Sequence, residues 1–198
     1  IFKDFSQEQV NKIVKAMAEA GYLASEKLAK LAVEESGFGK YEDKIIKNRF
    51  ATKNVYESIK DLKTAGIVDI EAEGKVIKIA VPMGVVCALV PSTNPTSTAM
   101  FKALISLKCR NAIVVSPHPR TANCTFESLK ILSDASIEAG APAGLIQSML
   151  NSTIEGTEAL MQDKLIAVIL ATGSTPMVKA AYSAGKPAYG VGAGKIQE

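Results

Sequence analysis

Asn94 lies in a run of small polar residues and prolines, 91–98, that directly follows the apolar run 85–90. An asparagine carboxamide can donate a hydrogen bond to an oxygen atom that develops negative charge during a reaction. Asparagine is equally typical of turns and helix caps, so its neighbours alone leave both interpretations of Asn94 open. The apolar run is bounded by Gly84 and Pro91, which predicts a strand buried on both faces. Polar residues at the carboxyl end of such a strand lie where open α/β sheets bind ligands.

Two further polar clusters follow apolar runs. Residues 116–119, Ser-Pro-His-Pro, contain the single histidine, His118, which is a candidate general base. The alternative is a loop histidine between prolines, since no carboxylate lies nearby in sequence. Residues 172–176, Thr-Gly-Ser-Thr-Pro, predict a helix start with Thr175 as N-cap and Pro176 at the first helical position. Free amides at a helix start can bind a phosphate, although many such starts bind nothing.

A glycine-rich loop, residues 190–195, ends the series of polar clusters. Its sequence, Gly-Val-Gly-Ala-Gly-Lys, is similar to a phosphate-binding loop but matches neither common glycine pattern. Tyr189 stands where a P-loop needs glycine, and Ile196 stands where it needs serine or threonine. We expect these glycines to let the backbone pass close to a ligand.

The elements that would position these clusters alternate from residue 85 onward, which predicts strands joined by helices. The expected strands are 85–90, 112–115, 145–149, 166–171 and 187–191. The expected helices are 96–109, 121–139, 154–163 and 175–184. This order predicts an α/β fold with a Rossmann-like, open and mostly parallel sheet that helices cover on both faces.

Helical patterns precede this region. A capping box at Ser6 and Gln9 starts a first helix, which we expect Gly21 to end. A second helix ends before Gly37, and a third amphipathic stretch covers residues 41–65.

A change of period marks the next segment. Residues 67–71 and 75–80 alternate in polarity around Ala-Glu-Gly, which predicts a β-hairpin. A two-stranded ribbon is rarely stable alone, so the hairpin is expected to pack on another domain or subunit. We interpret 1–198 as one domain with helices in 1–66, the hairpin in 67–82 and βα units in 83–198.

Composition limits the class of protein. Hydrophobic residues make up 47% of the chain, which predicts a substantial core, and the net charge of +3 is too small and too evenly spread to favour nucleic acid. No apolar stretch is long enough to predict a membrane span. An odd number of cysteines without metal-ligand spacing predicts a reducing, cytoplasmic location, no metal site, and small hydrophobic roles for Cys87, Cys109 and Cys124.

The order of four motifs resembles one family. PSTNP, SPHP, ATGST and GVGAGK follow one another as in the aldehyde dehydrogenase superfamily, and the chain is similar to its CoA-acylating branch. That branch includes acetaldehyde dehydrogenase and the aldehyde half of bifunctional aldehyde–alcohol dehydrogenases. The resemblance extends to FGKYEDKIIKNRFAT and MVKAAYSAGKPAYGVG, so it covers nearly the whole chain.

This resemblance implies a role for each cluster. Asn94 would stabilise the oxyanion of a thiohemiacetal, and the hairpin would serve in homo-oligomer formation. The positions that would contact the cofactor are Pro91, Ser92, Thr93 and Gly192 near the nicotinamide, Ser116 and His118 at the adenosine ribose, and Thr172, Gly173 and Ser174 near the pyrophosphate. The cofactor is expected to be NAD, with NADP possible because residues 116–120 contain no carboxylate.

Two departures shape the functional prediction. The family nucleophile is a cysteine of a second domain that none of the three cysteines matches, so we expect the catalytic domain to be absent from this chain. The hydrolytic branch carries a glutamate where this chain has residues 190–195, a loop without a carboxylate. The resemblance therefore implies an acylating enzyme that converts a small-molecule aldehyde, CoA and NAD to acyl-CoA and NADH. Acetaldehyde is the default substrate, and propionaldehyde, succinate semialdehyde and sulfoacetaldehyde stay open. A non-catalytic nucleotide-binding module and a thioester-hydrolysing relative remain alternatives, as does a location in a bacterial microcompartment.

Overall fold

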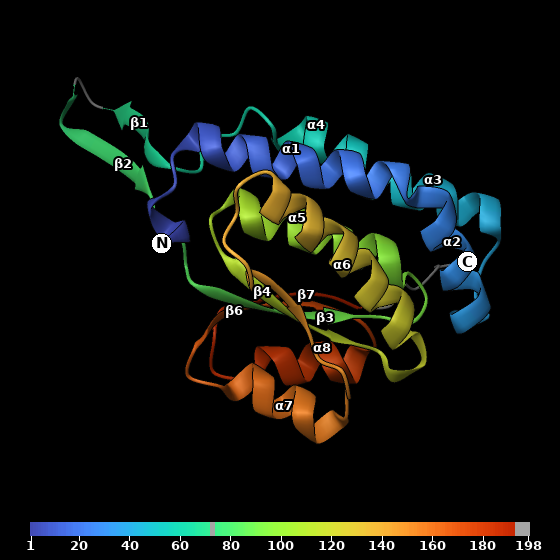
Figure 1. Cartoon of the computed structure of the whole chain (residues 1–198). Coiled ribbons are helices and arrows are strands. Elements are labelled where there is room, and N and C mark those ends of the chain that lie inside the picture. Colours follow the sequence, from blue (N-terminus) through green and yellow to red (C-terminus); the bar gives the residue numbers. More distant parts are fainter. Residues whose placement is uncertain (72–73, 193–198) are drawn as a thin grey trace, which may run out of the picture.

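A twisted sheet with helices on both faces forms the body of the molecule, and a β-hairpin projects from one end (Figure 1). The computed structural model describes residues 1–71 and 74–192. The sheet has five parallel strands in the order β5-β4-β3-β6-β7, which confirms the predicted α/β, Rossmann-like fold. The strands are β3 (Val85–Val90), β4 (Ala112–Pro117), β5 (Ile146–Ser148), β6 (Ile166–Thr172) and β7 (Ala188–Val191).

The central strand β3 has both faces buried, as its continuous apolar sequence predicts. Alternate residues point to opposite faces of a strand, so β3 contributes to two separate cores. Val86, Ala88 and Val90 belong to the larger hydrophobic cluster. Cys87 and Leu89 belong to the smaller cluster on the other face.

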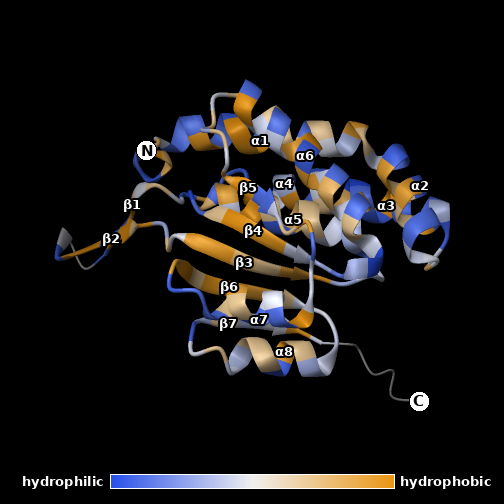
Figure 2. Cartoon of the chain, turned by 60° about the horizontal axis from the view of Figure 1, so that its bottom comes forward, coloured by the Kyte–Doolittle hydropathy of each residue, from blue (hydrophilic) through white to orange (hydrophobic). Residues whose placement is uncertain are grey.

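The two faces of the sheet carry different helices. Helices α5 (Pro95–Lys108) and α6 (Ala122–Glu138) cover one face, and α7 (Ile154–Gln162) and α8 (Thr175–Tyr182) cover the other (Figure 1). The central strands between these two pairs of helices are mainly hydrophobic (Figure 2). No helix within 1–71 and 74–192 is both long and apolar enough to cross a bilayer.

A second helical layer packs over α5 and α6. It contains the 3-10 turn η1 (Phe2–Asp4), α1 (Gln7–Leu23), α2 (Ser25–Ser36), α3 (Tyr41–Arg49), the π-helical turn η2 (Phe50–Asn54) and α4 (Val55–Ile59). Helix α1 lies against α6, and η2 lies against α5. The capping box is confirmed, because Gln9 N–H donates to Ser6 Oγ at 3.3 Å and Ser6 N–H donates to Gln9 Oε1 at 2.8 Å.

Two predicted helix ends in this layer are wrong. Gly21 lies inside α1, which ends at Leu23, and it is buried. A Cβ atom at Gly21 would lie 2.7 Å from Thr52 Cγ2, so close packing of α1 against η2 explains the glycine better than helix termination. The stretch 41–65 is not one helix, because η2 interrupts it and α4 ends at Ile59.

The C-terminal half also departs from the predicted bounds. Ser174, rather than Thr175, is the N-cap of α8, so Pro176 occupies the second helical position. The edge strands β5 and β7 are shorter than predicted, since each is paired with the sheet along one side only. The short 3-10 turn η4 (Pro119–Thr121) joins β4 to α6.

The predicted hairpin is present as the antiparallel pair β1 (Gly66–Glu71) and β2 (Val76–Ala80). It extends away from the body, beside the N-terminus (Figure 1). Its apolar side chains Ile67, Ile70, Ile77 and Ile79 are all more than half exposed.

Candidate functional site

A cleft of about 760 Å³ opens at the carboxyl ends of the parallel strands. It is lined by the residues that follow β3, β4, β6 and β7 and by the start of α7. All ten positions singled out from the sequence line this one cleft: Pro91, Ser92, Thr93, Asn94, Ser116, His118, Thr172, Gly173, Ser174 and Gly192.

The strand order explains why these distant segments meet. From β3 the chain moves outward to β4 and β5, and α7 then returns it to β6 on the other side of β3. The loops after β3 and β6 therefore diverge to opposite faces and leave a crevice between them. Strands β3, β4 and β6 run side by side, with their arrowheads on the side away from the hairpin (Figure 2).

Asn94 occupies the N-cap position of α5 but does not act as a cap. Its side chain makes no capping hydrogen bond. Instead, Lys47 Nζ donates to Asn94 Oδ1 at 3.1 Å. The one described acceptor for Nδ2 is Thr93 Oγ1 at 3.5 Å, a distance at which a hydrogen bond is weak. The carboxamide therefore keeps donor capacity in the cleft.

The loop before Asn94 is held from the outer helical layer. Lys44 Nζ donates to the carbonyl oxygen of Thr93 at 2.5 Å, and the Lys44 side chain is buried. Burial is the main cause that lowers the pKa of Lys44, and the charge of Lys47 lowers it further.

Ser116 and His118 follow β4 at the opposite wall. Ser116 is buried, and its hydroxyl pairs with the Thr157 hydroxyl at 2.8 Å. His118 is exposed, and its Nδ1 accepts from the Arg120 backbone N–H at 3.1 Å. No carboxylate in 1–71 or 74–192 bonds to His118, so the geometry gives a general-base role no support.

The segment after β6 leads into α8. Gly173 N–H donates to the Val191 carbonyl oxygen at 3.2 Å, which ties this segment to the end of β7. Ser174 caps α8 by position without a side-chain capping bond. The first amides of α8 therefore remain available at the edge of the cleft.

Sequence reasoning missed one wall of the cleft, which Ser152, Thr153, Ile154 and Thr157 form at the start of α7. Thr153 accepts from the Gly156 backbone N–H at 3.0 Å and so acts as the N-cap of α7. A Ser-Thr pair that follows a predicted strand and precedes a predicted helix carries the same signal as the motifs already recognised. Met177 of α8 also lines the cleft and was not predicted.

Gly190 lies in β7 and Gly192 directly follows that strand, and the space around the two glycines differs. A Cβ atom at Gly190 would lie 2.5 Å from Val178 Cγ1, so packing against α8, rather than approach of a ligand, accounts for this glycine. Among residues 1–71 and 74–192, a Cβ atom at Gly192 would meet only Thr175 Oγ1, at 3.9 Å, which is an ordinary contact distance. Gly194 and Lys195 lie outside the described residues.

No charged side chain is among the described residues that line the cleft. Just beneath it, the buried Lys102 donates through Nζ to the carbonyl oxygens of Leu89 and Leu170, each at 2.7 Å. Burial lowers the pKa of Lys102 to about 7. The amine therefore joins β3 to β6 at the point where the crevice begins.

All three cysteines are poor nucleophiles. Burial raises the pKa of Cys87 to about 12. Burial also raises the pKa of Cys109 and of Cys124, and hydrogen bonding with Glu35 raises that of Cys124 further. Because the thiolate is the reactive form, none of them is activated near neutral pH.

Comparison with known proteins extends this description. The sequence model of the aldehyde dehydrogenase family matches residues 1–189. The chain is 52% identical over 193 residues to the bifunctional aldehyde-alcohol dehydrogenase AdhE of Escherichia coli (strain K12), which covers 98% of this chain and 22% of that protein. The crystal structure of an acetylating aldehyde dehydrogenase from Geobacillus thermoglucosidasius is 53% identical with a TM-score of 0.96 and covers 98% of this chain and 43% of that one.

Two more distant structures contain ligands. Propionaldehyde dehydrogenase of Rhodopseudomonas palustris, solved with bound CoA, is 31% identical with a TM-score of 0.84 and covers 97% of this chain and 44% of that one. An engineered glycolyl-CoA reductase, solved with bound NADP+, is 30% identical with a TM-score of 0.83. The match covers 97% of this chain and 43% of that one.

In each of these comparisons the chain spans less than half the length of its relative, along nearly its own full length. The resemblance to the acylating branch is confirmed by relatives whose names include acetylating and acylating dehydrogenases. The motif order, the sheet with its crevice and the family match agree, and the chain belongs to the aldehyde dehydrogenase family.

Proposed function

We propose that this chain is the cofactor-binding part of a longer NAD(P)-dependent acylating aldehyde dehydrogenase, which converts an aldehyde, CoA and NAD to acyl-CoA and NADH. The observation that carries the proposal is the cleft that gathers described residues of all four motifs around an Asn94 carboxamide not used as a cap. In this proposal a cysteine of a second domain forms the covalent adduct with the aldehyde. NAD, when bound, accepts the hydride.

The cleft fits a dinucleotide. Its volume of about 760 Å³ falls in the usual range for sites that bind small molecules and cofactors. The free amides at the start of α8, next to Gly173 and Ser174, would hold the pyrophosphate as helix N-termini do. His118 and the buried Ser116 would lie at the adenosine ribose, and Pro91 to Thr93 with Gly192 would line the nicotinamide end.

Asn94 would act on the substrate oxygen. When a thiolate adds to an aldehyde, the carbonyl oxygen becomes an oxyanion, and a fixed amide N–H stabilises it more than it stabilises the substrate. The Nδ2 group of Asn94 has only its long contact with Thr93 Oγ1, so it retains the required donor.

CoA, rather than water, is the proposed nucleophile that releases the acyl group from the thioester, because the described residues of the cleft offer no carboxylate to act as a base. Water attacks a thioester slowly unless a group such as a carboxylate removes its proton. The described cleft contains no carboxylate, and residues 190–195 contain none in the sequence. A thiol is partly thiolate near neutral pH and needs less help, and Gly192, which lines the cleft without a side chain, takes up little of the space that such a nucleophile would enter.

The test measures the product formed by a full-length protein that contains this chain and a second domain. Aldehyde and NAD are supplied with and without CoA, and acyl-CoA and free acid are quantified. We expect steady NADH formation and acyl-CoA only when CoA is present. Release of free acid at the same rate without CoA would favour the hydrolytic alternative, and no aldehyde oxidation at all would favour a non-catalytic nucleotide-binding module.

The hairpin β1–β2 suits a role in homo-oligomer formation. Its four isoleucines are exposed, and in Figure 1 the ribbon reaches away from the body, where another subunit could cover it. Homo-oligomer formation, acetaldehyde as the default substrate and a cytoplasmic or microcompartment location stay predictions.

A further inference from the structure

One face of α3 holds the segment that carries Asn94. Lys44, Lys47 and Asn48 are spaced three and four residues apart, so they lie on one side of the helix. Lys44 donates to the Thr93 carbonyl oxygen and Lys47 to Asn94 Oδ1. Thr96 Oγ1, in the first turn of α5, donates to Asn48 Oδ1 at 2.8 Å.

Two of these contacts are buried and one is exposed. Lys44 and Asn48 are 4% and 1% exposed, and Asn48 Nδ2 also donates to the Ser25 carbonyl oxygen at 3.0 Å. Lys44 thus holds the loop backbone at Thr93, and Asn48 holds the start of α5 at the Thr96 side chain. Lys47 is exposed, touches only the Asn94 side chain among described hydrogen-bond partners, and can therefore be changed without disturbing the core.

The contact of Lys47 determines which way the carboxamide faces. An ammonium group has only donors, so the atom it meets must be the carboxamide oxygen and not its nitrogen. An asparagine at an N-cap position would otherwise turn that oxygen toward the amides of its own helix. At Asn94 this capping bond is not made. Lys47 thus competes with α5 for Asn94 Oδ1.

We propose that Lys47 is a positioning residue that holds the Asn94 carbonyl oxygen away from α5 and so presents Nδ2 to the substrate oxygen. The bond is charge-assisted, which makes it stronger than a neutral one, and it polarises the carboxamide so that the N–H becomes a better donor. The proposal rests on the proposed function of Asn94 and deepens it, because it names the group that orients the oxyanion donor.

The kinetic test is a double-mutant cycle in the full-length protein, with Lys47→Met, Asn94→Ala and the double variant. We expect Lys47→Met alone to lower kcat about tenfold, which corresponds to about 1.4 kcal/mol. The KM for NAD should stay within about twofold, because the contact acts on the substrate oxygen. On the Asn94→Ala background the same change should cost less than about twofold.

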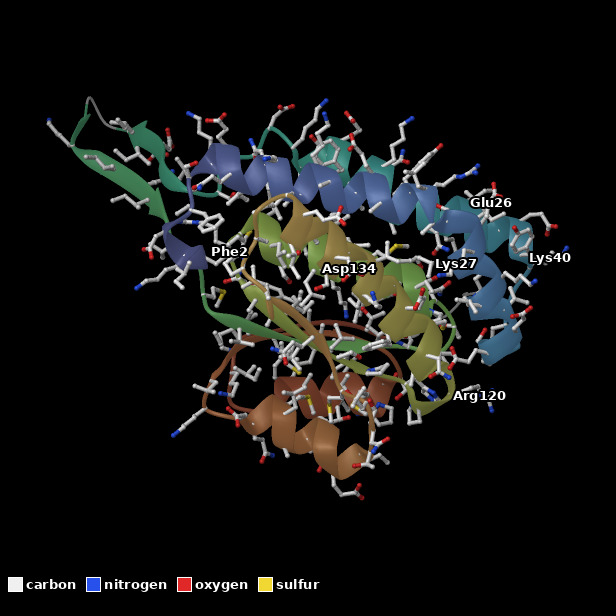
Figure 3. The ribbon with its side chains drawn as sticks, in the orientation of Figure 1. Phe2, Glu26, Lys27, Lys40, Arg120 and Asp134 are labelled. Atoms are coloured by element: carbon white, nitrogen blue, oxygen red, sulfur yellow. The ribbon has the colours of Figure 1, made fainter. Side chains whose placement is uncertain are left out.

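Two variants serve as controls. Lys47→Arg keeps a cationic donor that can reach Oδ1 and should recover most of the lost turnover. Lys40→Met removes a lysine next to the same helix whose side chain points into solvent (Figure 3), and it should leave kcat unchanged. Equal losses from Lys47→Met in both backgrounds would overturn the proposal.

A structural readout separates this proposal from the proposed function. In a crystal structure of Lys47→Met, Asn94 Oδ1 should accept from the backbone N–H of Thr96 or Ser97 and become an ordinary cap, with a melting temperature no lower than that of the parent. An unchanged carboxamide would overturn the positioning role even in an active enzyme. If the parent protein forms no acyl-CoA, the proposed function is refuted while the orientation result still stands.

Discussion

Lys102 should make the stability of this fold depend on pH in a direction unusual for a lysine that makes hydrogen bonds. Its amine is buried between β3 and β6, with 3% of the residue exposed and two carbonyl oxygens as partners. Burial lowers its pKa from 10.5 to about 7. Between these two values the unfolded chain binds a proton that the folded chain does not, so raising the pH stabilises the fold.

The size of the effect follows from the two pKa values. One differential proton changes the free energy of unfolding by at most about 1.4 kcal/mol per pH unit. From pH 7 to pH 9 this amounts to about 2 kcal/mol for Lys102. Lys44 and Lys108, whose pKa values are also lowered by burial, act in the same direction. Above pH 9 the raised pKa of Cys87 opposes it, because the unfolded thiol ionises first.

The assay is urea unfolding of the protein and of Lys102→Met at half-unit steps from pH 7 to pH 9. Met fills similar volume but removes the two hydrogen bonds from Nζ to the Leu89 and Leu170 carbonyl oxygens, at about 1 kcal/mol for each bond. We expect the parent to gain stability across this range and the variant to gain less, so that their difference grows with pH. Parallel curves for the two proteins would refute the assigned titration of Lys102.

Three functional predictions follow. Asn94→Ala in the full-length enzyme should lower kcat by about a hundred- to thousandfold with little change in NAD affinity, and a loss of NAD binding alone would make Asn94 a structural residue. The 198-residue chain by itself should not oxidise aldehydes, since its thiols have raised pKa values; aldehyde-dependent NADH formation that a cysteine substitution abolishes would contradict this. NADP should be tolerated, because no carboxylate lies in 116–120 and the exposed Arg120 (Figure 3) offers a cation to a 2′-phosphate; a preference for NAD above about ten-thousandfold, roughly 5 kcal/mol, would count against it.

The sequence by itself determined the features that depend on neighbouring residues. A continuous apolar run between Gly84 and Pro91 has few structures open to it other than a buried strand, and β3 forms there. The capping box at Ser6, the hairpin and the alternation of strand and helix were likewise readable, because caps, turns and periodicity act over only a few residues.

Glycines show where local reasoning fails. Gly21 was interpreted as a helix end and Gly190 as part of a ligand loop. At each position a helical segment packs so closely that a Cβ atom would clash with it. The neighbours responsible, Thr52 and Val178, lie 31 and 12 residues away along the chain. A local sequence pattern does not predict which distant side chain will occupy the space next to a glycine.

Only the tertiary structure decided how the motifs meet. The order β5-β4-β3-β6-β7 places the end of β6 beside the end of β3. The loops that follow these two strands diverge to opposite faces of the sheet, and the crevice lies between them. Packing of α3 against the loop likewise decided that Asn94 faces Lys47 rather than its own helix. These arrangements minimise the free energy of the whole chain through contacts between residues far apart in sequence. Local patterns determine the helices, strands and turns, and long-range packing determines which of these elements lie next to one another.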